Sequence, residues 1–187
     1  MKHRTGVLIG TLLLIIFLVS TIFPASAYSY SGNKWDATYV VPKKDSTIPS
    51  SWSSALTAAT DTWNNAGASF TFRWMTSAAQ NTLSYSSLGS SGPIASSYPT
   101  VDQNTGYLTR CRITFNSAYS WSTSSGGTSG CYDVQAIATH EFGHWLMLLD
   151  LYSSADTEKT MYGYATTNEI KKRTLTSDDI EGIRSIY

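Results

Sequence analysis

In three segments of the chain, hydrophobic residues recur at the spacing of a helix. In the first, apolar side chains follow Pro49 at intervals of four, three and four, at Trp52, Leu56, Ala59 and Trp63. The second begins near Asp133, a residue type favoured at helix N-caps, and its apolar face holds Val134, Ile137, Ala138 and Phe142. The third repeats isoleucine every third residue from Ile180 and begins with a capping-box pattern, Thr176 with Asp179. Three amphipathic helices are therefore expected.

Other segments alternate apolar and polar residues or are rich in β-branched and aromatic residues, which predicts strands. These strands are expected at residues 35–41, 69–75, 82–88, 92–99 and 111–116. Ser-, Thr- and Gly-rich sequence surrounds the later strands and predicts loops. The order of strand, helix, mixed strands, helix, loop and helix predicts one α+β domain without an internal repeat.

The first 27 residues have the pattern of a secretory signal peptide. Basic residues precede an apolar run from Val7 to Phe23, and Ala25-Ser26-Ala27 then provides a small-residue cleavage site. If this segment were retained, it would anchor the protein in a membrane; no later stretch is apolar for long enough to span one. We therefore expect an exported protein whose single domain is residues 28–187.

Composition narrows the expected partners. The chain has 13 basic and 13 acidic residues, and loss of Lys2 and Arg4 with the signal would leave a slight acidic excess. That balance argues against nucleic acid or an anionic membrane as a partner. In an oxidising compartment, Cys111 and Cys131 are predicted to form a disulfide that closes a loop of about 20 residues and stabilises the fold by about 3 kcal/mol.

The run HEFGHWLMLLD, residues 140–150, carries the candidate chemistry. His140 and His144 are four residues apart and so share one face of a helix, as two ligands of one metal require. Glu141 is placed to take a proton from a metal-bound water and pass it to a leaving amine. The alternative interpretation is a buried helix whose histidines make only core contacts. The complete H-E-x-x-H pattern favours a zinc hydrolase that cleaves peptide bonds.

HEFGHWLMLLD followed by TEKTMYGYA resembles the metzincin metalloproteases, and the matrixin branch in particular. The family motif is H-E-x-x-H-x-x-G-x-x-H/D, with a methionine-containing turn soon after. GPIASSYP, residues 92–99, is similar to the edge strand along which substrate lies, and LTSDDIEGIRSIY to the closing helix. The resemblance implies a zincin-like α+β domain with three helices and a mostly parallel, twisted sheet that has an antiparallel edge strand. It also implies a monomeric, secreted zinc endopeptidase with peptide or protein substrates.

The same resemblance implies roles for individual residues. His140 and His144 would be zinc ligands, Glu141 the general base, and Met161 the methionine beneath the metal. Asp150 stands at the position of the third ligand. Glu169, in TTNEIKK, remains a rival because it resembles the downstream Asn-Glu of thermolysin-like enzymes. Calcium is implied as well, and no residues can be assigned to it.

Met147 departs from the family pattern, because the motif has glycine there. A residue with a side chain adopts a positive φ only at a cost, so we expect the chain to leave the helix near residues 145–148 by another route. In an unbroken helix, Asp150 would lie about 240° around the axis from His144, facing away from the metal. This irregularity keeps two other hypotheses open: a binding module that retains the metal without turnover, and a structural domain without metal. The presence of Glu141 favours the enzyme.

Overall fold

The computed structural model describes residues 28–75 and 80–187, so the predicted signal peptide lies outside the described residues. Within these ranges the α-helices are α1 (Ser53–Asn64), α2 (Val134–Trp145) and α3 (Ser177–Ile186), with short 3₁₀ turns η1 (Ser50–Trp52), η2 (Ser154–Asp156) and η3 (Lys171–Arg173). The strands are β1 (Ser29–Tyr30), β2 (Tyr39–Val40), β3 (Pro42–Lys44), β4 (Thr71–Phe72), β5 (Asn81–Ser86), β6 (Ala95–Val101), β7 (Leu108–Asn116), β8 (Trp121–Ser122), β9 (Tyr132–Asp133) and β10 (Leu148–Leu149). None of the described helices is long and apolar enough to cross a membrane.

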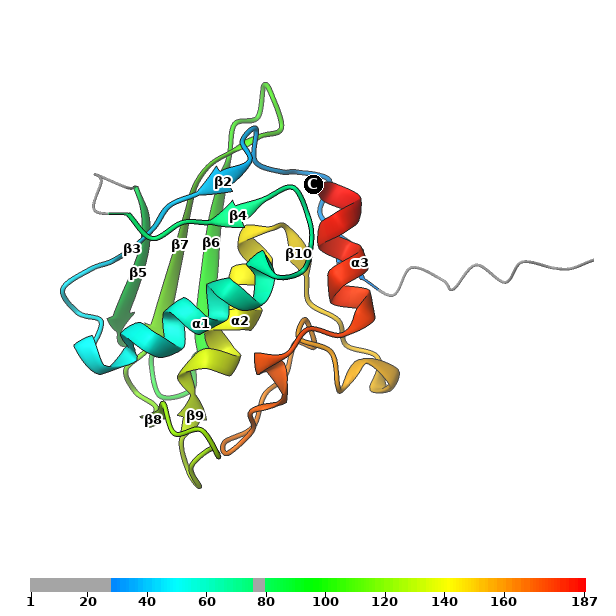
Figure 1. Cartoon of the computed structure of the whole chain (residues 1–187). Coiled ribbons are helices and arrows are strands. Elements are labelled where there is room, and N and C mark those ends of the chain that lie inside the picture. Colours follow the sequence, from blue (N-terminus) through cyan, green and yellow to red (C-terminus); the bar gives the residue numbers. More distant parts are fainter. Residues whose placement is uncertain (1–27, 76–79) are drawn as a thin grey trace, which may run out of the picture.

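A four-stranded sheet in the order β3-β5-β7-β6 forms one layer of the domain. The β3–β5 and β5–β7 pairs are parallel, whereas β6 runs antiparallel to β7 at the edge. This arrangement confirms the predicted α+β fold with a mixed sheet and an antiparallel edge strand. Helices α1 and α2 lie together over one face of the sheet (Figure 1).

The core lies between this sheet face and the two helices. In β7, every second side chain (Cys111, Ile113 and Phe115) is completely buried, as expected for alternation on a covered face. The predicted apolar stripe of α1 is buried as well, and Trp63 Nε1 donates a hydrogen bond to the Thr139 carbonyl of α2 at 2.8 Å. Burial of the stripe thus fixes α1 against α2, the helix that carries the histidines.

Helix α2 begins where the sequence predicted. Asp133 is its N-cap, and the Asp133 side chain accepts a hydrogen bond from the Ala136 amide at 2.8 Å. Arg173 in η3 pairs with the same carboxylate through Nη2 at 2.5 Å and Nε at 2.8 Å. Asp133 is 2% exposed, so this charge is compensated within the protein. The pairing fixes the start of α2 to the segment that precedes α3.

Two predicted strands are much shorter in the structure. The segment 35–41 contributes only β2 before β3 begins, and 69–75 contributes only β4. Trp35 is buried outside any strand, because its indole Nε1 donates to the Trp145 carbonyl at the end of α2 at 2.7 Å. Side-chain packing against the helix end has therefore overridden local strand propensity at this residue.

The predicted disulfide is wrong, because Cys111 and Cys131 are free cysteines. Cys111 lies in the middle of β7, four residues before Phe115, which packs against Trp121 next to β9. Cys111 is completely buried in the sheet, whereas Cys131 is partly exposed and immediately precedes β9.

The prediction that the chain avoids a positive φ at Met147 when it leaves the helix is also wrong. The chain leaves α2 at Met147 through a left-handed conformation, φ 66°, the same kind of turn that a glycine would make. The Met147 amide donates to the His144 carbonyl at 3.0 Å, and the side chain is 6% exposed within the core. The free energy gained by burying this side chain offsets part of the conformational cost of the positive φ.

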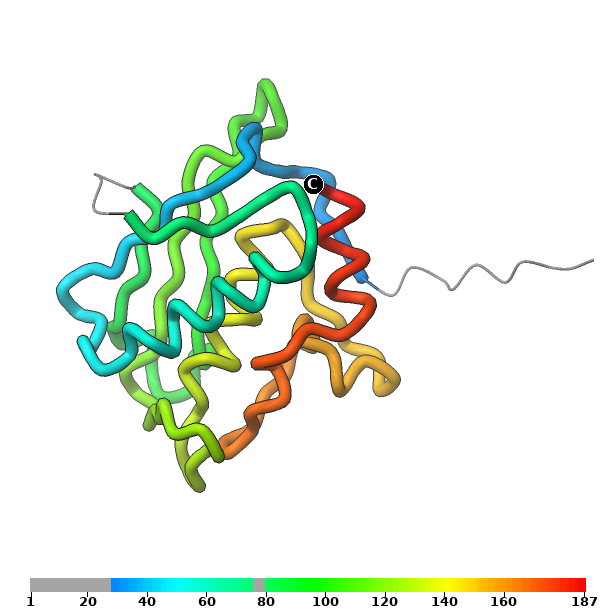
Figure 2. Tube along the Cα trace, in the orientation of Figure 1, coloured from blue at the N-terminus to red at the C-terminus, as the bar shows by residue number. Residues whose placement is uncertain are grey.

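The turn after α2 is also held from outside. β1 pairs antiparallel with β10, and the Ser31 amide donates to the Met147 carbonyl at 3.1 Å. Figure 2 shows this blue N-terminal segment running beside the turn and α3. The earliest described residues therefore hold the segment that leads to Asp150.

Glycine and alanine at position 147 provide a test of the strained turn. Met147→Gly and Met147→Ala both remove the buried side chain, but only glycine relieves the positive φ. We expect the glycine variant to be more stable than the alanine variant by about 1 kcal/mol in urea unfolding. At exposed Thr57 in α1, the same pair of substitutions should show the opposite order. An alanine variant as stable as the glycine variant at position 147 would contradict the strained turn.

Candidate metal centre

The two histidines of α2 are both held through their Nδ1 atoms. His140 Nδ1 lies 2.8 Å from the Thr160 carbonyl oxygen, and His144 Nδ1 lies 2.8 Å from the Leu148 carbonyl oxygen. A carbonyl can only accept a hydrogen bond, so in the neutral rings these contacts place the proton on Nδ1. Each Nε2 then presents a lone pair, as a metal-ligating histidine requires.

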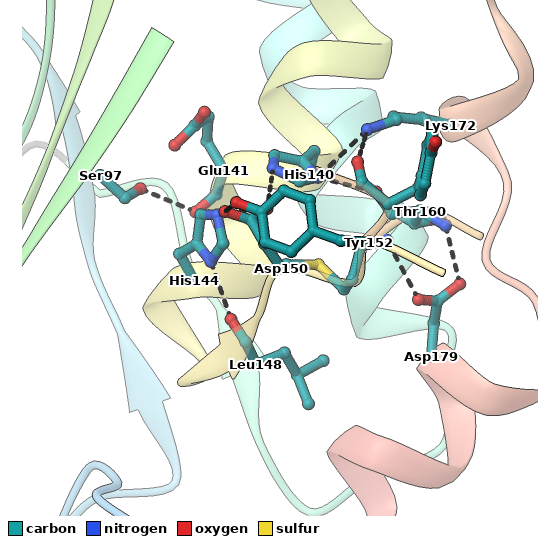
Figure 3. Close-up of polar contacts among 12 residues, drawn as sticks. Ser97, His140, Glu141, His144, Leu148, Asp150, Tyr152, Thr160, Lys172 and Asp179 are labelled. Carbon is teal, nitrogen blue, oxygen red and sulfur yellow. Dashed lines mark hydrogen bonds and ion pairs between the residues drawn. The ribbon is translucent and has the colours of Figure 1, made fainter. Parts of the chain in front are cut away.

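The third member of the site is Asp150, which the turn at Met147 brings back to the histidines. Its Oδ1 lies 3.2 Å from His140 Nε2 and 3.6 Å from His144 Nε2. Ligand atoms from these three residues all lie within 4.8 Å of one another (Figure 3). Around a tetrahedral zinc ion with bonds of about 2.0–2.1 Å, neighbouring ligand atoms lie about 3.3 Å apart. The donor set suits zinc, and the distances of 3.2 and 3.6 Å from Asp150 Oδ1 to the two imidazoles are close to that spacing.

Electrostatics supports a cation at this position. Burial and the nearby His140 ring lower the pKa of His144, which favours the neutral imidazole. Burial raises the pKa of Asp150, but a positive charge on His140 and His144, a hydrogen bond from His140 and one from Tyr152 outweigh burial and lower that pKa to about 2. With both rings neutral, two lone pairs and a carboxylate oxygen converge, and Asp150 Oδ1 is buried without a hydrogen-bond partner among the described residues. A shared positive charge would satisfy all three atoms.

Glu141 lies next to this group on the side of the open cavity. The residue is 5% exposed, and its Oε2 is buried without a hydrogen-bond partner among the described residues. The cavity has a volume of about 590 Å³ and extends from the edge strand β6 past Glu141 to residues 163–165. Ser97 on β6 donates to the Glu141 carbonyl at 3.0 Å, which fixes the strand against the helix (Figure 3). Glu141 therefore lines the same cavity as the histidines and Asp150.

Gly143 allows Met161 to pack directly against α2. A Cβ at position 143 would lie 2.3 Å from the Met161 sulfur and 3.0 Å from the Trp63 ring. Met161 is 1% exposed and packs on the helix turn between the two histidines. Gly143 therefore has a steric role in the HEFGH run that the sequence analysis missed.

Asp179 at the start of α3 is connected to His140 through hydrogen bonds with the backbone of Thr160. The predicted capping box with Thr176 is confirmed. The same carboxylate also accepts hydrogen bonds from the Thr160 amide at 3.1 Å and the Met161 amide at 3.3 Å. Because the Thr160 carbonyl holds His140, the closing helix is connected to a candidate ligand through one residue.

Glu169, the rival third ligand, contributes no atom to the group. Its carboxylate accepts a hydrogen bond from Thr166 Oγ1 at 3.1 Å and lies 3.9 Å from Lys171 Nζ. No other cluster of three or more His, Cys, Asp or Glu side chains occurs in the part of the chain that the structure describes. The expected calcium remains a prediction without residues.

Sequence reasoning missed the buried Lys172. It is 2% exposed, donates to the Tyr162 carbonyl and lies 3.4 Å from His140 Nδ1. Burial lowers the pKa of Lys172 to about 8, although Glu169 and other nearby acids oppose that shift. In the sequence it belongs to a Lys-Lys-Arg run that is typical of a solvated surface, so no local pattern indicates its burial.

The sequence analysis also missed Tyr152. The Tyr152 hydroxyl donates to Asp150 Oδ2 at 3.1 Å, whereas Tyr164 is 62% exposed. Tyr152 follows the candidate third ligand by two residues. That spacing is the only signal the sequence offers for it.

The third ligand can be tested by substitution. Asp150→Ala should lower zinc occupancy strongly, because it removes one of three converging atoms, whereas Glu169→Ala should leave occupancy close to that of the parent protein. Elemental analysis of both purified variants measures this directly. A greater loss in Glu169→Ala would place the third ligand outside the observed group.

Comparison with known proteins shows which family this chain resembles. The family model for Matrixin matches residues 31–187. A segment of 55 residues is 44% identical to Metalloendoproteinase 2-MMP from Arabidopsis thaliana. That match covers 29% of this chain and 14% of the plant protein.

Proposed function

The chain belongs to the matrixin family, and on that premise we propose that it is a secreted zinc endopeptidase. Family membership supports a zinc metalloprotease in general, and the N-terminal sequence supports export. One observation carries the catalytic part of the proposal. His140, His144 and Asp150 converge on one point, and the unpaired carboxylate oxygen of Glu141 is buried beside a cavity that reaches the sheet edge.

Each residue has a defined task in peptide hydrolysis. His140, His144 and Asp150 would bind the ion, with their remaining polar atoms held by the protein. Zinc, when bound, supplies Lewis acidity and lowers the pKa of a coordinated water to about 7. Glu141 takes the proton of the attacking water and gives it to the leaving amine as the C–N bond breaks. Glu141 Oε2 has no hydrogen-bond partner among the described residues, so no protein group competes for that oxygen.

The edge strand β6 is the proposed binding surface for substrate. It pairs with β7 on one side only, and residues 92–97 line the cavity. A peptide that adds as an antiparallel strand along this edge would bring a carbonyl group towards Glu141 and the histidines. The contact between Ser97 and Glu141 fixes the distance from this edge to the catalytic helix.

Substitution of the proposed base tests this function. Glu141→Gln keeps the side-chain shape but cannot accept a proton, so hydrolysis of a denatured protein substrate should fall by about 10²–10⁴-fold while zinc content stays unchanged. Glu181→Gln, at an exposed position on α3, is the matched control and should retain activity.

Two results would contradict the proposal. Full activity in Glu141→Gln would remove Glu141 as the base. A zinc-loaded parent protein that cleaves no peptide or denatured protein would favour the alternative, a binding module that retains the fold and metal.

A further inference from the structure

We propose that Tyr152 is a positioning residue that holds the third metal ligand in its binding orientation. The proposal rests on the function proposed above, because it concerns the same site. The hydroxyl of Tyr152 donates to Asp150 Oδ2 at 3.1 Å, while Oδ1 of the same carboxylate faces the two imidazoles. Figure 3 shows the Tyr152 hydroxyl beside the carboxylate and the histidine rings.

The three candidate ligands share one feature of their hydrogen bonding. Each has a second polar atom, on the side away from the metal position, that is held by a hydrogen bond. For His140 and His144 the partner is a backbone carbonyl. For Asp150 it is the Tyr152 side chain. Hydrogen bonds of this kind orient metal ligands and contribute to affinity. Only the partner of Asp150 is a side chain, so among these three hydrogen bonds only this one can be removed by substituting the partner.

The tyrosine ring has a defined position although the residue is 60% exposed. A Cβ at Gly163 would lie 2.4 Å from Cε1 and 2.8 Å from Cζ of Tyr152, so the ring packs directly on the glycine backbone. The ring also makes an edge contact with Tyr164, with centroids 5.5 Å apart. Gly163 is itself fixed, because its amide donates to the Leu151 carbonyl at 2.9 Å. The glycine after the Met161–Tyr162 pair therefore makes room for the ring that holds the ligand.

The hydrogen bond also determines how the carboxylate would bind. With Oδ2 occupied by the hydroxyl, Asp150 presents one oxygen to the metal and leaves a coordination position open. Without the hydroxyl, Oδ2 is free to rotate towards the ion or towards solvent. Loss of the hydroxyl should therefore weaken binding and raise the coordination number.

Tyr152→Phe tests the proposal, because it removes the hydroxyl and keeps the ring. Zinc affinity, measured by chelator competition, should fall by roughly 10-fold or more. In the cobalt-substituted protein, the visible absorption should lose intensity as the coordination number rises. The melting temperature of the metal-free protein should not change, which separates ligand positioning from a general structural role. Tyr39→Phe, at another exposed tyrosine away from the cavity, is the matched control and should leave all three measurements unchanged.

A second variant tests the same hydrogen bond without removing the hydroxyl. Gly163→Ala forces the Tyr152 ring away and should weaken zinc binding to a similar extent. The double variant should then lose little more than either single variant, because both act through one contact.

The outcomes distinguish this inference from the proposed function. If the parent protein binds zinc and Tyr152→Phe binds it equally well, the positioning role is overturned and the function stands. A fall in kcat with unchanged zinc affinity would also overturn it, because the hydroxyl would then act on substrate. If the parent protein binds no zinc, the proposed function fails and this inference fails with it.

Discussion

The left-handed turn at Met147 is the constraint on which the site depends. Without it, α2 would carry Asp150 to the far side of the helix axis from His144. With it, the chain reverses after Trp145, the Leu148 carbonyl accepts from His144 Nδ1, and Asp150 Oδ1 reaches both imidazoles. A single backbone conformation thus orients one histidine and delivers the third candidate ligand. The buried methionine side chain opposes the strain of that conformation.

Distant parts of the chain hold this turn and the helix before it. Trp35 binds the last carbonyl of α2, and β1 pairs with the two residues just before Asp150. From the other end of the chain, Asp179 fixes the Thr160 amide, whose carbonyl orients His140. The site is therefore built by both ends of the described chain. These restraints are burial and hydrogen bonds within the protein, and together they bring the three candidate ligand atoms close to one another.

Features with a local cause could be predicted from the sequence. Helix α2 and its Asp133 cap follow from apolar periodicity, and the capping box of α3 follows from residue types three positions apart. The H-E-x-x-H spacing alone places two imidazoles on one helix face. These predictions succeeded because each depends on a few neighbouring residues.

Features that depend on packing between distant residues could not be predicted. Met147 adopts the conformation expected of glycine because burial in the core opposes the strain, which no local rule reveals. The disulfide prediction was wrong because it rested on compartment and loop length, and neither shows that Cys111 is buried in β7 while Cys131 is partly exposed before β9. Burial of Lys172 beside His140 and the packing of the Tyr152 ring on Gly163 likewise arise only when separate segments meet.

Two imidazoles and one aspartate of this chain are predicted to bind a single zinc ion. X-ray absorption at the zinc edge of the purified, zinc-loaded protein tests it most directly. We expect two imidazole nitrogens and additional oxygen ligands, all at about 2.0–2.2 Å, with no sulfur. Sulfur scattering near 2.3 Å, or a shell without imidazole, would place the metal elsewhere and contradict the account.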